Sequence, residues 1–152
     1  MRSDADAAAF KRINEEWITR MFSLTDEDRK LLDDPVTHIV SPGGDVLVAR
    51  IEDSTVVGCI ALVPYGNQVF ELAKMGVTPQ AQGRGTGRKL VTAAIDRARE
   101  LGGLRIFLGT NTRLEPAVHL YAEAGFKRIS REDLPVADYY ARADILMELK
   151  LR

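Results

Sequence analysis

The hydrophobic period of this 152-residue chain changes in its middle third. Residues 69–77, VFELAKMGV, follow the period of a β-strand, and residues 85–101 then place apolar side chains at helical spacing. Gly102 and Gly103 end the helical pattern, and the apolar run LRIFLGT follows at residues 104–110. A strand, a helix and a second buried strand in this order predict a βαβ unit with two parallel strands.

The segments on both sides of this unit predict a mixed α/β (α+β) fold in a single domain, residues 1–152. Two helices come first, and two strands then lead into the unit as an antiparallel meander. One more helix and a closing hairpin of two strands follow the unit. The expected ranges are helices at 5–22 and from Thr25 to just before Asp34, strands at 45–52 and 56–65, a helix at 117–124, and closing strands at 126–130 and 143–151. Thr25 and Asp28 have the form of a capping box that begins the second helix.

Composition excludes several classes of protein. Charged residues make up 28% of the chain and the formal net charge is −1, so there is no global basic field for nucleic acid or an anionic membrane. The longest apolar run, residues 56–63, is too short to cross a bilayer. A single Cys59 suits a reducing compartment, and no apolar signal segment follows the first residues, so we expect a cytoplasmic protein. The only histidines, His38 and His119, are far apart in the sequence, and no metal site is expected.

Residues 82–88, QGRGTGR, connect the first strand of the unit to its helix and carry few side chains. They lack the third glycine of a dinucleotide fingerprint, and the chain has no P-loop triplet. Unpaired N–H groups and the positive end of the helix dipole meet at such a helix start. Without side chains at Gly83, Gly85 and Gly87, a phosphate or pyrophosphate could reach those N–H groups. The alternative is that the glycines only make a tight turn.

The hexapeptide QGRGTG resembles the Gln/Arg-x-x-Gly-x-Gly/Ala signature of the GNAT superfamily of acetyl-CoA-dependent N-acetyltransferases. VFELAKMGVTP before it, LGTN at residues 108–111 and PAVHLYAEAGF at residues 116–126 are similar to the family's successive blocks, so the resemblance covers roughly half of the chain. Thr86 departs from the family, in which this position is often aliphatic. The resemblance implies a GNAT-like fold whose two parallel strands splay apart beside acetyl-CoA.

The resemblance also implies which residues bind acetyl-CoA. The loop N–H groups would hold the pyrophosphate, and the main chain of residues 75–77 would pair with pantetheine like an added strand. Asn111 matches the family's second cofactor-contacting segment, with a plain turn residue as the alternative. The cofactor-binding candidates are Met75, Gly76, Val77, Gln82, Gly83, Arg84, Gly85, Thr86, Gly87, Arg88 and Asn111.

Acetyl transfer to an amine needs a base, because an alkylammonium with a pKa of about 10.4 is not nucleophilic at neutral pH. Glu71 is the candidate base, and its position resembles that of the catalytic glutamate in histone-acetylating relatives. Strand alternation would place it on one apolar face with Val69, Ala73, Met75 and Val77, which would raise its pKa. The alternatives are a water relay in place of Glu71, or a structural carboxylate paired with arginine or lysine.

The leaving CoA thiolate benefits from a proton donor. Tyr121, within LYAEAGF, resembles the family tyrosine that faces the CoA sulfur, although a packing role on the same helix explains it too. Trp17 lies on a helix that walls the acceptor pocket in the family, with a core position as the alternative. Tyr139, Tyr140 and Arg142 precede the last strand, where the fold often supplies acceptor contacts.

The sequence therefore predicts an N-acetyltransferase that acts on a primary amine of a small molecule or peptide. The alternative is a non-catalytic acyl-CoA-binding sensor or regulatory module, which would bind the co-substrate without needing Glu71 or Tyr121. The near-neutral charge does not select the acceptor. The resemblance leaves a homodimer open, and no segment indicates an interface.

Overall fold

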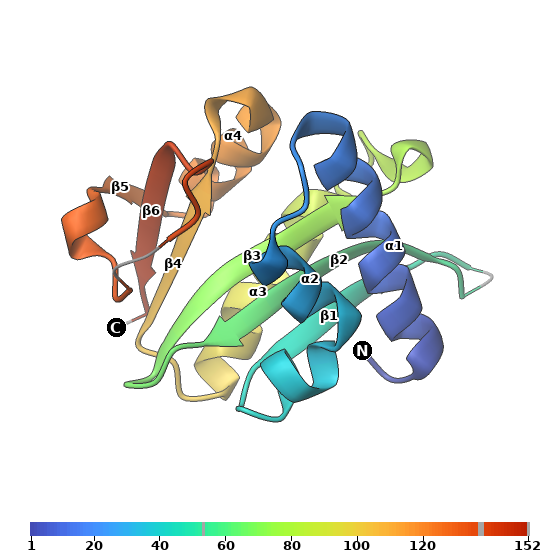
Figure 1. Ribbon diagram of the computed structural model, residues 1–152, viewed down its shortest axis with the longest axis horizontal. Coiled ribbons are helices and arrows are strands. Elements are labelled where there is room, and N and C mark those ends of the chain that lie inside the picture. Colours follow the sequence, from blue (N-terminus) through green and yellow to red (C-terminus); the bar gives the residue numbers. More distant parts are fainter. Residues whose placement is uncertain (53, 137–138, 152) are drawn as a thin grey trace.

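The structure, a computed structural model, describes residues 1–52, 54–136 and 139–151 (Figure 1). Its sheet has the strand order β1-β2-β3-β4-β6-β5. The strands are β1 (Asp45–Arg50), β2 (Val56–Pro64), β3 (Val69–Val77), β4 (Arg105–Thr110), β5 (Lys127–Ile129) and β6 (Ile145–Lys150). The α-helices are α1 (Asp4–Met21), α2 (Asp26–Asp33), α3 (Thr86–Glu100) and α4 (Glu115–Glu123).

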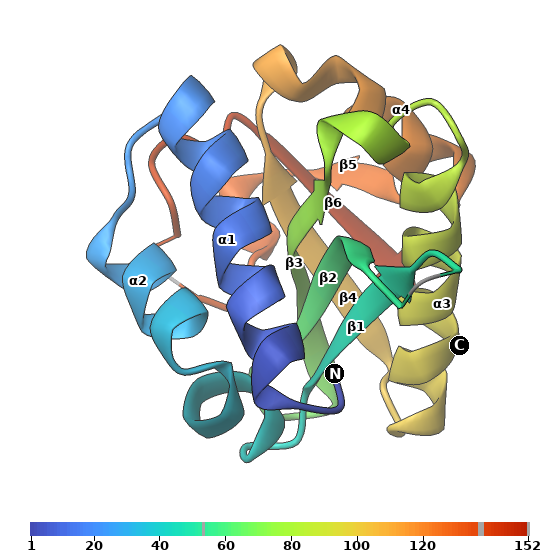
Figure 2. The same cartoon turned by 90° about the vertical axis from the view of Figure 1, so that its right-hand side faces the viewer.

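Helices cover both faces of the sheet. Helices α1 and α2 lie on one face and α3 lies on the other (Figure 2). Each face has its own buried apolar cluster, one that includes Phe10 and Ile13 of α1 and one that includes Leu90 and Val91 of α3. The mixed fold, the two N-terminal helices and the meander are thus confirmed. No helix in the described part of the chain is long and apolar enough to cross a membrane.

Strands β3 and β4 are parallel, as predicted, but they pair over a short length only. The paired residues are Val69 with Arg105, Phe70 with Ile106, and Glu71 with Phe107. Beyond them the two strands diverge toward their carboxyl ends (Figure 1). Antiparallel partners hold each strand on its outer side, β2 along β3 and β6 along β4. The splay implied by the family resemblance is therefore present. The closing strands are also antiparallel, with β6 next to β4.

A β-bulge interrupts β3 in its second half. Ala73 pairs with Ala61 of β2, and the next pair that flanks the irregularity joins Gly76 to Cys59, so β3 advances three residues while β2 advances two. Lys74 lies at the bulge with a positive φ of 56°. One extra residue in a strand reverses the face on which every later side chain lies.

The bulge corrects the predicted environment of Glu71. Its cross-strand partner Val63 belongs to the cluster beneath α1, so Glu71 is on the α1 face. Met75 and Val77 pack with the cluster beneath α3 instead. The prediction that Met75 and Val77 share a face with Glu71 is wrong, because it assumed unbroken alternation. Gly76 is the residue that returns to the α1 face, where a Cβ would lie 2.7 Å from the Ile13 side chain.

A buried ion cluster joins three distant parts of the chain. Asp28 is the third residue of α2, where it completes the predicted capping box with Thr25. Its fully buried carboxylate also accepts bonds from Lys74 of β3 and from both Nη atoms of Arg142, at 2.8 and 2.7 Å. Burial alone would raise the pKa of Asp28, but the bonds from Arg142 and Lys74 outweigh it and hold the pKa well below its ordinary value. The cluster therefore fixes α2, β3 and the segment before β6 to one another.

We expect Asp28→Asn to lower the free energy of unfolding by about 3–5 kcal/mol, because it leaves the buried Lys74 and the partly buried Arg142 without a counterion. Thr25→Ala is the matched control, since it removes the helix cap alone and should cost about 0.5–2 kcal/mol. Urea unfolding measures both. Because the folded-state pKa of Asp28 is lowered, its contribution is present above the unfolded pKa of about 3.9 and is lost as the pH falls below that value.

The difference in the free energy of unfolding between the wild type and Asp28→Asn should therefore become smaller in acid. A loss for Asp28→Asn no larger than that for Thr25→Ala would mean that Asp28 stabilises the fold only as a helix cap.

Candidate active site

Neighbouring cavities follow the splay from the glycine loop to the segment before β6. The loop cradle, about 760 Å³, lies at the glycine loop and is lined by Gly83, Gly85, Thr86, Gly87 and Arg88 among others. The strand slot, about 210 Å³, is lined by residues 72–77 of β3 with Gly109, Thr110 and Tyr121. The Glu71 cavity, about 70 Å³, follows it. The arginine cavity, about 610 Å³, is lined by Arg20, Phe22, Arg113, Tyr140 and Arg142 among others.

The loop cradle contains an open backbone at the start of α3. Gly83 and Gly85 have φ of 81° and 79°, and a Cβ on either would meet no atom within 4 Å. No side chain caps α3, whose N-cap is Gly85. The first N–H groups of a helix have no intrahelical partner. The cradle thus has open space for a phosphate group and N–H donors without an intrahelical partner, beside glycines whose positive φ few other residues adopt.

The other loop candidates have different environments. The Gln82 side chain donates to the carbonyl of Val77 at 3.2 Å, which ties the loop to the end of β3. Arg88 lines the cradle and pairs with Glu123 of α4. Arg84 is exposed and is not among the described residues that line the cradle. Arg84 is therefore the one loop candidate outside the described lining of the cradle.

The strand slot lies where β3 and β4 separate. The main chain of β3 after Glu71 has no strand partner on the β4 side in the described structure. This edge includes Met75, Gly76 and Val77, which line the slot. An extended ligand could add to such an edge through main-chain hydrogen bonds. Gly76 is required for a separate reason, because α1 packs directly on its Cα.

Tyr121 projects from α4 into the same slot. It is 8% exposed and packs edge-to-face against Phe126, with 6.0 Å between ring centroids. No described residue is hydrogen-bonded to its hydroxyl, so the O–H is available to a ligand. Burial raises the pKa of Tyr121 well above its ordinary value, so the phenol is protonated at neutral pH. The Tyr121 ring therefore packs in the core while its hydroxyl is available to donate a proton.

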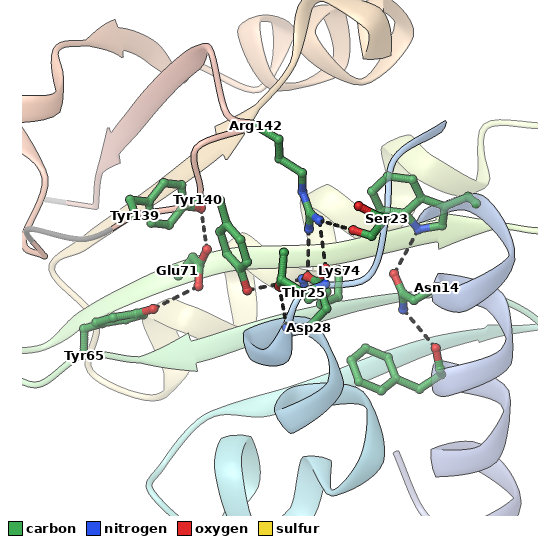
Figure 3. Close-up of polar contacts among 12 residues, drawn as sticks. Asn14, Ser23, Thr25, Asp28, Tyr65, Glu71, Lys74, Tyr139, Tyr140 and Arg142 are labelled. Atoms are coloured by element: carbon green, nitrogen blue, oxygen red, sulfur yellow. Dashed lines mark hydrogen bonds and ion pairs between the residues drawn. The ribbon is translucent and has the colours of Figure 1, made fainter. Parts of the chain in front are cut away.

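Glu71 lies between two tyrosines (Figure 3). The Tyr65 hydroxyl donates to Oε1 at 3.2 Å, and the Tyr139 hydroxyl donates to Oε2. Glu71 is 1% exposed, and burial raises its pKa while the bond from Tyr139 and the charge of Lys74 oppose the rise. The predicted direction of the pKa shift is confirmed. Of the predicted apolar neighbours, Ala73 shares the face of Glu71, whereas Met75 and Val77 do not. The bonded partners are phenols instead of the arginine or lysine of the structural alternative.

The two tyrosines are held in place by β4. Phe107 makes edge-to-face contacts with Tyr65 and Tyr139, at centroid distances of 5.2 and 5.8 Å. The Tyr139 ring lies on Gly109, where a Cβ would come within 2.1 Å of Cε2. Tyr65, Gly109, Lys74 and Asp28 were not identified from the sequence as residues of the site. The one available signal was the presence of two charged residues within the buried strand VFELAKMGV.

Asn111 lies on the Glu71 cavity and not on the loop cradle. Its Nδ2 donates to the carbonyl of Arg142 at 2.7 Å, and its Oδ1 accepts from the N–H of Arg113 at 2.9 Å. It therefore fastens the end of β4 to the segment before β6. Trp17 lines both the Glu71 cavity and the strand slot, and its Nε1 donates to Asn14 at 3.0 Å. Tyr139, Tyr140 and Arg142, named from the sequence because the segment before the last strand often supplies acceptor contacts in this fold, line the Glu71 cavity.

Comparison with known proteins identifies the family. Residues 8–126 match the model of the acetyltransferase (GNAT) family. An uncharacterized N-acetyltransferase of Schizosaccharomyces pombe is 33% identical over 128 residues, which are 80% of this chain and 77% of that protein. A GNAT-family acetyltransferase structure from Staphylococcus aureus has a TM-score of 0.89 at 22% identity and covers 99% of this chain and 96% of its own.

A phosphinothricin acetyltransferase from Sinorhizobium meliloti, solved in complex with acetyl-CoA, has a TM-score of 0.74 at 17% identity and covers 98% of this chain and 85% of its own. At such identities the structural matches establish the fold. The family model and the yeast relative establish membership. The chain belongs to the GNAT acetyltransferase family and is an acyltransferase.

Proposed function

We propose that this protein transfers the acetyl group of acetyl-CoA to a primary amine of a small molecule or peptide. The observation that carries the proposal is the continuous path from the open N–H groups of the loop cradle, along the free edge of β3, to the buried carboxylate of Glu71. The pyrophosphate would bind residues 83–88, and pantetheine would extend along residues 75–77. The thioester would then lie between Tyr121 and Glu71.

Glu71 is the proposed base. A carboxylate has about four lone-pair sites, so the two tyrosine bonds leave acceptor capacity for a proton. The Glu71 cavity has enough space for ordered water, which can carry the proton from an ammonium that does not touch the carboxylate. The neutral amine attacks the thioester carbonyl, the C–S bond breaks, and the thiolate takes a proton from Tyr121. The acylated nitrogen then gives up its extra proton, which returns Tyr121 to the neutral phenol.

Replacing Gly85 with valine should abolish the rise in melting temperature that acetyl-CoA produces by binding the native state. A valine would extend from the αL position into the loop cradle. Gly66→Val is the matched control, because Gly66 has φ of 77°, close to the 79° of Gly85, and equally open space. Both variants should lose about 1–2 kcal/mol of stability from backbone strain. Only Gly85→Val should lose the shift. An equal shift in both variants would place the pyrophosphate elsewhere.

Replacing Tyr139 with phenylalanine should move the acid limb of the kcat/KM–pH profile to higher pH. The Tyr139 bond stabilises the ionised form of Glu71 and lowers its pKa, so its loss raises that pKa and the base is protonated at a higher pH. The phenylalanine ring keeps the contact with Phe107. The profile is measured with acceptors of different pKa, because the ionisation of the amine itself also produces an acid limb.

Glu71→Gln is the reference for this experiment. It should bind acetyl-CoA normally, lose about 10²–10⁴-fold in rate and lose the limb that Tyr139→Phe moves. A full rate and an unchanged profile in Glu71→Gln would assign the proton to a water relay without Glu71. Acetyl-CoA binding with no turnover of any amine by the wild type would favour the non-catalytic module.

Replacing Tyr121 with phenylalanine should lower kcat by about 10²-fold while the affinity for acetyl-CoA and the stability change little. The substitution removes a hydroxyl to which no described residue is hydrogen-bonded and keeps the ring against Phe126. Steady-state kinetics and urea unfolding provide the two readouts. An unchanged kcat would limit Tyr121 to packing.

A further inference from the structure

The arginine cavity is strongly biased in charge. Three arginines line it, namely Arg20, Arg113 and Arg142. No aspartate or glutamate is among the described residues of its lining. The chain as a whole is nearly neutral, so this concentration of guanidinium groups is local. A positive cavity of this kind favours an anionic ligand and repels a cationic one.

The three arginines differ in how far their charge is already neutralised. The charge of Arg142 faces a counterion, because its guanidinium makes two bonds to Asp28 and one to the carbonyl of Ser23 (Figure 3). Arg20 pairs with Glu16 at the surface, where both side chains are about half exposed and such pairs are weak.

Arg113 contacts the face of Phe22, with its Cζ 4.9 Å from the ring centroid. In the described part of the chain, no carboxylate forms an ion pair with it. Arg113 is also exposed. Its guanidinium is therefore oriented by the Phe22 ring and available to an external anion.

The arginine cavity adjoins the Glu71 cavity. Phe22, Tyr140 and Arg142 line both. A small molecule held by its anionic end at Arg113 would extend past these side chains, with its other end toward Glu71. The Glu71 cavity, at about 70 Å³, admits a slender chain with an amino group and excludes a large ring system.

We propose that the acceptor is an amino acid, whose carboxylate binds Arg113 in the arginine cavity while its amine points toward Glu71. A guanidinium presents paired donors that match the two oxygens of a carboxylate. Arg20, on the same cavity, adds attraction. Polyamines and other acceptors that carry additional cations are disfavoured. This inference rests on the proposed function, because it names the substrate of the same site.

The test measures thiol release from acetyl-CoA with amino acids, with the carboxamide of each, and with uncharged and polycationic amines. Both α- and ω-amino acids are included, because the panel also defines the length of the acceptor. The carboxamide keeps the carbon skeleton and the amine but removes the negative charge. We expect the preferred amino acid to exceed its carboxamide by about 10²-fold in kcat/KM, since a site built for a polar group rejects the analogue that lacks it.

Arg113→Gln should raise the KM for the amino acid by about 10–100-fold, the range for loss of a hydrogen bond to a charged group. The KM for acetyl-CoA and the slow turnover of the carboxamide should not change, and Arg113→Lys should restore part of the loss. Arg128→Gln is the matched control, because Arg128 is exposed on β5 and lines none of the described cavities.

The outcomes separate the two proposals. Turnover of polyamines or uncharged amines at or above the rate of amino acids would overturn the amino-acid inference and leave the N-acetyltransferase proposal intact. A higher KM for acetyl-CoA in Arg113→Gln, with an unchanged KM for the amino acid, would assign Arg113 to the phosphates of the co-substrate, since Arg113 also borders the loop cradle. No turnover of any amine by the wild type would count against the proposed function itself.

Discussion

The separation of β3 from β4 after Glu71 is the constraint on which the site depends. Each strand has a complete antiparallel partner on its outer side, so the sheet holds together although its two central strands share only three residue pairs. The separation leaves the edge of β3 after Glu71 without a strand partner on the β4 side in the described structure, which is costly for any main-chain group that stays unbonded there. It is therefore the natural place for an extended ligand to complete the sheet.

The Asp28 cluster spans this gap from outside the sheet. It joins a helix on the α1 face to β3 and to the segment that leads into β6, so it connects the two halves of the divided sheet. Buried ion pairs add little net stability compared with apolar packing, but removing one partner is costly. We infer that the cluster sets the relative position of Glu71 on β3 and Tyr139 and Tyr140 before β6.

The sequence was sufficient to predict features that depend on local patterns. The βαβ unit, the capping box at Thr25 and the open glycine loop follow from periodicity and from residue types within a few positions. The bulge at Lys74 was not predictable, because it depends on the register with β2, and it reversed the faces of Met75 and Val77. The contact of Tyr139 with Glu71 was not predicted, because the two residues are 68 positions apart and no periodic pattern links them.

The charges around the Glu71 cavity connect the proposed acceptor to the proposed base. With Glu71 and Asp28 ionised, Lys74 and Arg142 balance them. When Glu71 takes the proton of the amine, these four side chains acquire a net charge of one positive unit in a largely buried region. That charge opposes the protonation of Glu71. A carboxylate held nearby at Arg113 would offset that charge only for an acceptor that carries one. The carboxylate of an amino acid would thus act in two ways. It would bind Arg113, and it would stabilise the protonated Glu71 while the amine loses its proton.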